Sequence, residues 1–166
     1  MKRLLRIGIG VCAVLVTLVL NLGGASAAGP AMTCTADLQI FTTTTGDVRS
    51  AGPITFFRDS GTSGMYMSGF LAGYQLSGTQ DIMLNSKTGL SELHGSYTAS
   101  GPDGTLTIRY NGHADTTTGA ATGNFVTAGG TGVFADFHWS GSITAQQPVV
   151  GVPFFNATDS GSCHGL

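Results

Sequence analysis

The sequence predicts an all-β protein, a single antiparallel barrel of about eight strands preceded by a signal peptide. Frequent glycines exclude long helices, because a glycine inside a helix costs about 1 kcal/mol relative to alanine. After Gly46, no glycine-free run is longer than ten residues. The stretches between the glycines are rich in Thr, Val, Ile, Phe and Tyr, which suit a pleated, half-buried surface.

Turn signals recur roughly every 8–15 residues, which is the rhythm of a small antiparallel sandwich or barrel. They are Gly-, Ser-, Asp- and Thr-rich clusters, as β-turns require. These clusters lie at 60–64, 77–78, 87–89, 101–104, 118–119 and 129–132. The strands predicted between them are 35–43, 54–58, 65–76, 80–84, 90–99, 105–115, 120–127 and 133–140.

Alternation of side chains assigns faces to the longer segments. In 105–115, one face carries Leu106, Ile108, Tyr110, Gly112 and Ala114, and the other carries polar residues. Single glycines inside predicted strands indicate bends where a sheet curls tightly; they are Gly69, Gly73, Gly95 and Gly112. A sheet that bends this often is expected to close into a barrel.

The first 27 residues have the pattern of a secretory signal peptide. A basic start (Lys2, Arg3 and Arg6) precedes the apolar run 7–20, and small residues allow cleavage after Ala27. An apolar run of this length is short for a membrane span, which needs roughly 20 residues. The alternative is an uncleaved anchor. We therefore expect a secreted or periplasmic protein with no stable membrane anchor after cleavage.

Residues 28–166 then form one domain, with core strands at roughly 35–145 and a C-terminal tail at 146–166. Three of the seven Lys and Arg residues leave with the signal peptide and all nine Asp and Glu remain, so the mature chain carries a net charge of −5. No basic patch is visible. Nucleic acid is therefore excluded as a partner, because phosphate binding depends on clustered Lys and Arg.

Two cysteines remain after cleavage, one near each end of the domain. In an oxidising compartment, Cys34 and Cys163 are predicted to form a disulfide. The alternative is a reactive or metal-binding thiol at Cys163, which His164 follows.

One local pattern is specific. Gly129-Gly130-Thr131-Gly132 followed by Phe134, and preceded by Gly123 and Phe125, resembles a hairpin of the allene oxide cyclase-like and dirigent-like barrels. The similarity covers roughly 106–144 and is weaker before it. The resemblance implies eight antiparallel strands around an apolar cavity. It also implies, in the enzymes of the family, cyclisation or coupling of hydrophobic intermediates held in one conformation. The hairpin carries no catalytic residue, and no cofactor is expected.

No hydrolase or metal motif is present. The chain has no Gly-x-Ser-x-Gly elbow, and its four histidines, His94, His113, His138 and His164, lack ligand spacing. Glu92 and His94 share a strand face. If that face turns into the lumen, they are the best acid–base candidates; otherwise they belong to a solvated face.

The aromatic residues supply candidates for ligand binding. Tyr66, Phe70 and Tyr74 are predicted to share one face of strand 65–76, where they would line a lumen or fill an ordinary core. The leading hypothesis is a non-enzymatic exported module that binds a small apolar molecule. The alternative is a cyclase or isomerase acting in the lumen, and a third hypothesis is a surface interaction module without a cavity.

Overall fold

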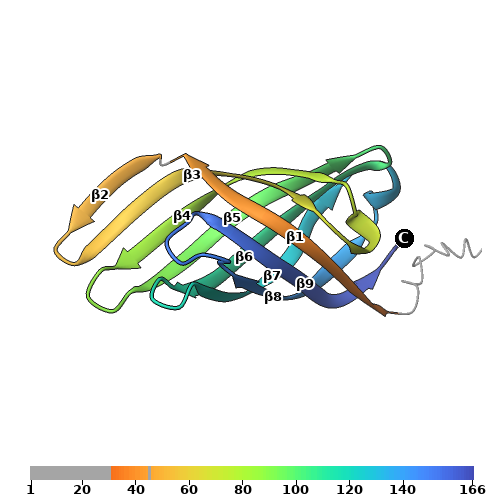
Figure 1. Ribbon diagram of the computed structural model, residues 1–166. Helices are drawn as coiled ribbons and strands as arrows, with labels where there is room; N and C mark the ends of the chain where they lie inside the picture. Colours follow the sequence, from red (N-terminus) through yellow and green to blue (C-terminus); the bar gives the residue numbers. More distant parts are fainter. Residues whose placement is uncertain (1–30, 45) are drawn as a thin grey trace, which may run out of the picture.

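The computed structural model describes residues 31–44 and 46–166 and is all-β (Figure 1). The predicted signal peptide lies outside these residues. The strands are β1 (Met32–Thr44), β2 (Asp47–Ala51), β3 (Ile54–Tyr66), β4 (Gln75–Asn85), β5 (Leu90–Gly101), β6 (Gly104–Asp115), β7 (Ala120–Gly130), β8 (His138–Gln146) and β9 (Phe154–His164). Two 3₁₀ turns are η1 (Gly69–Leu71) and η2 (Gly132–Phe134). In the described part of the chain, no helix is long and apolar enough to cross a membrane.

The predicted barrel is confirmed: eight strands close into a ring. Strands β3 to β8 each pair antiparallel with the next strand in sequence, and β1 pairs with both β9 and β3. The five-residue strand β2 lies outside the ring and pairs with the first half of β3, so the two project together at one end (Figure 1). Each strand of the ring therefore has two neighbours.

Alternation along the strands separates an inner from an outer layer. The face of β6 predicted to be apolar does point inward: Leu106 and Ile108 are fully buried, while Arg109 and Asn111 on the other face are exposed. The core continues around the ring through Leu38, Leu76, Tyr97, Phe125 and Trp139.

Inward-facing glycines let the strands approach closely. Gly141 of β8 lies directly opposite Gly161 of β9. A Cβ atom on Gly141 would collide with the carbonyl oxygen of Ser160, and one on Gly161 would collide with that of Ser140. The close approach of the two backbones at this pair of strands therefore requires glycine.

Two similar heptapeptides fill one end of the barrel. Residues 68–74 (SGFLAGY) contain η1 and residues 131–137 (TGVFADF) contain η2, and each begins with an extended Ser or Thr before a glycine of positive φ. The fourth residue of each, Leu71 or Phe134, is buried. Aromatic rings of the two segments and of β8 contact each other across this end: Phe70 lies 5.3 Å from Phe137 and 4.9 Å from Trp139 between ring centroids. We call this the plugged end.

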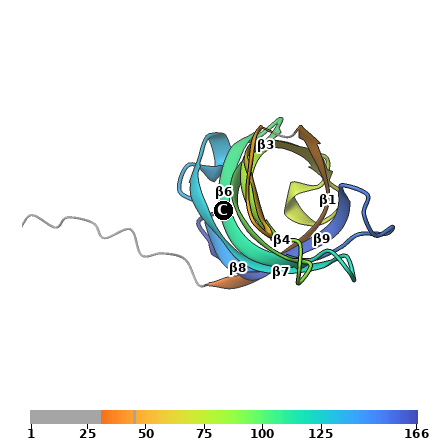
Figure 2. The ribbon, with the colours of Figure 1, turned by 90° about the vertical axis from the view of Figure 1, so that its left-hand side faces the viewer.

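The opposite end carries the β2–β3 hairpin and the turns that join β4 to β5, β6 to β7 and β8 to β9. Figure 2 views the ring of strands from this end. No 3₁₀ turn of the described residues lies across it. We call it the open end.

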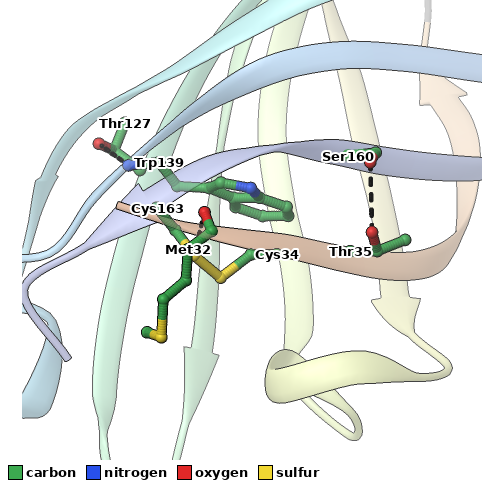
Figure 3. Close-up of a disulfide and its surroundings, with 7 residues drawn as sticks. All are labelled: Met32, Cys34, Thr35, Thr127, Trp139, Ser160 and Cys163. Atoms are coloured by element: carbon green, nitrogen blue, oxygen red, sulfur yellow. Dashed lines mark hydrogen bonds between the residues drawn. A yellow bond between two sulfur atoms is a disulfide. The ribbon is translucent and has the colours of Figure 1, made fainter. Parts of the chain in front are cut away.

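The predicted disulfide is confirmed. Cys34 of β1 and Cys163 of β9 are bonded, with Cα atoms 5.8 Å apart and a sequence separation of 129 (Figure 3). The bond crosses the seam between the first and last strands, close to Trp139. A disulfide is compatible with an extracellular location.

Several predicted strands were wrong in extent. The turns predicted at 60–64 and 77–78 lie inside β3 and β4, which extend well beyond the predicted strands 54–58 and 80–84. Residues 65–76 do not form one strand, because Gly69 and Gly73 adopt φ of 80° and 86° and turn the chain between β3 and β4. The amide of Gly73 donates to the carbonyl of Tyr66, closing this turn. The segment 133–140 begins in η2 rather than in a strand, and β8 starts at His138.

The predicted tail at 146–166 was also wrong in structure. Its second half forms β9, which pairs with both β1 and β8 along its length. The sequence there has no strong apolar alternation, because its inward positions are occupied by Ala157, Asp159, Gly161 and Cys163. Pairing with two neighbours, rather than burial of large side chains, keeps this segment extended.

Replacing both cysteines by alanine should lower the free energy of unfolding by about 2–5 kcal/mol, because the bridge closes a loop of 129 residues. Urea denaturation followed by the fluorescence of Trp139 measures this loss. Thr35→Ala is the control, since it removes only an exposed hydrogen bond to Ser160 across the same seam. Equal stability of the double variant and the control would contradict the assigned role of the disulfide.

Gly141→Ala should destabilise the protein by about 1–3 kcal/mol through overpacking against β9. The exposed neighbour Ser142→Ala should change stability little. The same denaturation experiment compares the two variants. If Gly141→Ala unfolds at the urea concentration of Ser142→Ala, the close approach of β8 and β9 is not required.

Candidate ligand cavity

A cavity of about 430 Å³ occupies the half of the barrel next to the open end. Small inward residues of three strands make room for it: Gly112, Ala114, Ala121, Gly123 and Ala145. Its walls are largely aliphatic and aromatic, and include Ile40, Phe57, Ile82, Leu84, Leu93, Ile143 and Phe155. Residues of the β6–β7 turn and the β8–β9 loop line its mouth, among them Thr116, Gln147 and Pro153.

A neutral polar patch interrupts the apolar wall. The Tyr110 hydroxyl donates to Gln80 Oε1 at 2.9 Å, and Gln80 Nε2 donates to Thr42 Oγ1 at 3.0 Å. All three side chains line the cavity. Tyr110 Oη and Thr42 Oγ1 keep acceptor capacity, and Gln80 Nε2 keeps a second N–H. The patch can therefore accept from or donate to one polar group of an otherwise apolar molecule.

Behind the floor of the cavity lies a buried carboxylate. Asp159 of β9 is fully buried, and its Oδ2 accepts hydrogen bonds of 2.8 Å from both Tyr66 and Tyr97. The two hydroxyl oxygens are 3.0 Å apart, so three oxygens form a compact triangle. Tyr97 belongs to both features, because it also lines the cavity. Ala157, the preceding inward residue of β9, lines the cavity as well.

Burial dominates the ionisation of this cluster. Removal from water raises the pKa of Asp159 from an ordinary 3.8 to about 6, against the opposing effect of the Tyr97 and Tyr66 hydrogen bonds. Burial likewise raises the pKa of Tyr66, Tyr97 and Tyr110. The tyrosines therefore stay protonated, as donors, throughout the neutral range.

Several interior polar atoms have no hydrogen-bond partner among the described residues. They are Asp159 Oδ1, Ser60 Oγ, Thr62 Oγ1 and Trp139 Nε1. Ser60 and Thr62 of β3 lie opposite Gln80 and Thr42 in the strand registers, so they back the neutral patch. Unsatisfied buried groups are rare in folded proteins.

The acid–base candidates predicted from the sequence do not reach the cavity. Glu92 and His94 are exposed on the outer face of β5, where Glu92 lies opposite His113 and His94 opposite Asp81. The face of β5 that carries Glu92 and His94 points to solvent, so these residues cannot act in the lumen. Inward positions of β5 are held instead by Ser91, Leu93, Gly95 and Tyr97.

The three predicted ligand-binding aromatics lie deeper than the cavity. Tyr66 bonds to Asp159 behind the floor. Phe70 and Tyr74 belong to the plugged end, where Tyr74 stacks edge-on against Phe134 and donates to Asp103. None of the three lines the cavity, because the chain turns at η1 rather than continuing as one strand.

Sequence reasoning missed Gln80, Tyr97 and Asp159. Tyr97 was accessible to it, since it alternates with Leu93 and Gly95 on the face opposite Glu92. Gln80 stood at the start of a predicted strand without a signal that it faces inward. Asp159 had no such signal either, because the sequence Thr-Asp-Ser in a segment predicted to be a tail is typical of a solvated loop.

The side chains that most often bind metal ions do not gather at one place in the described residues. In residues 31–44 and 46–166, no group of three or more His, Cys, Asp or Glu side chains is close enough to hold a metal ion. His138 and His164 lie opposite each other on β8 and β9, with ring centroids 5.0 Å apart. This pair of histidines lies on the outside of the barrel, away from the cavity.

Asp159→Asn should change how stability depends on pH. The folded protein holds the Asp159 proton more tightly than the unfolded chain, so this stabilisation is complete below about pH 3.8 and is lost as the pH rises to about 6. The difference between the pKa of 3.8 in the unfolded chain and about 6 in the folded protein corresponds to about 3 kcal/mol in the free energy of unfolding. Relative to wild type, the variant should therefore gain about 3 kcal/mol between pH 4 and pH 7. Urea denaturation across this range, with the exposed Asp136→Asn as control, measures it; parallel curves would contradict the burial of an ionisable Asp159.

Comparison with known proteins adds no relative. No protein-family model, no curated protein and no solved structure matches the chain. The resemblance to allene oxide cyclase-like barrels therefore stays a prediction, and the cavity and its polar groups carry the functional argument.

Proposed function

We propose that this protein is exported, with cleavage after Ala27, and binds a small, largely apolar molecule in the barrel cavity. The observation that carries this proposal is the cavity of about 430 Å³, which lies in the range of about 300–1,000 Å³ typical of ligand sites. A barrel of eight strands is usually just filled by its own side chains. Here one half is filled and the other is left open by small residues.

The lining fits an apolar ligand with one polar group. Apolar walls supply the hydrophobic driving force, at roughly 25 cal/mol per Å² removed from water. The patch of Thr42, Gln80 and Tyr110 supplies orientation through neutral hydrogen bonds. This combination of apolar walls and few polar groups is the usual chemistry of small-molecule sites.

The surroundings of the mouth support the same proposal. Leu90, Val149 and Val150 are exposed at the open end, beside the turns through which a ligand would pass. An apolar rim lowers the cost of moving an apolar molecule from solvent or a carrier into the cavity. The plugged end offers no second route, since it is filled by aromatic rings.

The cyclase or isomerase alternative is favoured by one observation, the Tyr97–Asp159 hydrogen bond at the floor of the cavity. A tyrosine hydroxyl held by a buried carboxylate can donate a hydrogen bond or a proton to a bound substrate. The acid–base residues predicted from the sequence for this alternative, Glu92 and His94, face solvent. Binding is common to both hypotheses and is therefore the function that we propose first.

Filling the cavity should abolish binding of a neutral apolar probe. N-phenyl-1-naphthylamine, whose fluorescence rises in apolar sites, should bind the wild type, and Ala145→Trp should weaken its affinity at least about tenfold by occupying the cavity. Thr144→Trp adds the same side chain to the outer face of the same strand and should bind as the wild type does. Wild-type protein that does not bind the probe, or equal affinities of the two tryptophan variants, would refute the proposal.

A further inference from the structure

Above the pKa of Asp159 of about 6, the interior of the barrel carries a negative charge with no neighbouring Lys or Arg. Asp159 is fully buried. The Lys and Arg residues in the described part of the chain are all exposed: Arg49, Arg58, Lys87 and Arg109. The ion pair found among the described residues joins Arg49 to Asp47 on the surface. Asp159 Oδ2 has two tyrosine donors, and Asp159 Oδ1 has no partner in that part of the chain.

This charge acts on the cavity. Ala157 and Asp159 are successive inward residues of β9, and consecutive inward positions of a strand are about 7 Å apart. Ala157 and Tyr97 line the cavity, so the carboxylate lies one inward position behind its floor. In a low-dielectric interior, a charge at this distance still changes affinity by at least about tenfold.

The floor also suits a cation in other ways. The rings of Tyr97 and Tyr110 both line the cavity, with centroids 5.7 Å apart, and aromatic faces attract ammonium groups. Tyr110 Oη and Thr42 Oγ1 can accept hydrogen bonds from an N–H group. No lysine or arginine lines the cavity to receive a carboxylate or phosphate.

We infer that the cavity selects lipophilic amines, molecules with an apolar body and one ammonium group, and rejects anionic amphiphiles such as fatty acids. The inference rests on the proposed function, because it names the charge class of the ligand of that same cavity. The ammonium group lies at the floor, toward Asp159, and the apolar body fills the aliphatic half up to the mouth. Charge complementarity, rather than a direct ion pair with Asp159, sets the preference.

The test compares three ligands of equal length that differ in head group: octylamine, 1-octanol and octanoate. Isothermal titration at pH 8, above the pKa of Asp159 of about 6, gives their dissociation constants. Octylamine should bind at least about tenfold more tightly than 1-octanol, and octanoate at least about tenfold more weakly. Equal binding of all three overturns the inference and leaves the proposed function standing. Absence of binding by all three overturns both.

Two variants locate the charge responsible. Asp159→Asn should bring the three dissociation constants within about threefold of each other, with that of 1-octanol unchanged. Asp115→Asn removes the carboxylate that lines the mouth and should keep the wild-type order. If Asp115→Asn abolishes the order instead, the rim and not the floor selects the ligand, and the inference is wrong. Should Asp159→Asn fail to fold, the wild-type order together with Asp115→Asn decides the question.

Discussion

The pairing of β1 with both β9 and β3 is the constraint on which the rest of the structure depends. It brings the first and last strands together, so that no ring strand is left with an unpaired edge, which would otherwise invite association with other chains. It also separates an interior from solvent. The disulfide crosses this seam near the plugged end, and the carboxyl of Asp159 lies on the side of the seam that faces the interior. Both features have their present environment only because the ring is closed.

The distribution of inward side chains then decides where the lumen stays open. Large residues such as Tyr66, Phe134 and Trp139 fill the half of the barrel at the plugged end. In the other half, alanine occupies positions where leucine or phenylalanine would fill the space, as Ala114 and Ala145 illustrate. An eight-stranded barrel is only just wide enough for its own side chains, so this change in residue size is sufficient to create a cavity with one mouth.

The barrel could be predicted from the sequence because it rests on local signals, and the disulfide because Cys34 and Cys163 are the two cysteines that follow the predicted signal peptide. Glycine spacing, turn residues and period-two alternation as in 105–115 are properties of short segments. The site could not be predicted, because it depends on which strands face each other across the ring. Tyr66, Tyr97 and Asp159 come from three strands that no local pattern brings together. The strand 154–164 was missed for a related reason: its inward residues are small or polar, and only pairing with β1 and β8 makes it a strand.

The position of Asp159 argues that the polar interior serves a purpose other than stability. Burying a carboxyl without a cation weakens the fold, and an apolar side chain of similar volume would avoid that cost. Two tyrosine hydroxyls reduce the cost but leave Oδ1 unpaired in the described structure. The same cluster is joined to the cavity through Tyr97, at the boundary between the filled and the open halves of the barrel. A group that is costly in the folded protein, and that lies where the proposed ligand would end, is what recognition of a charged ligand would require.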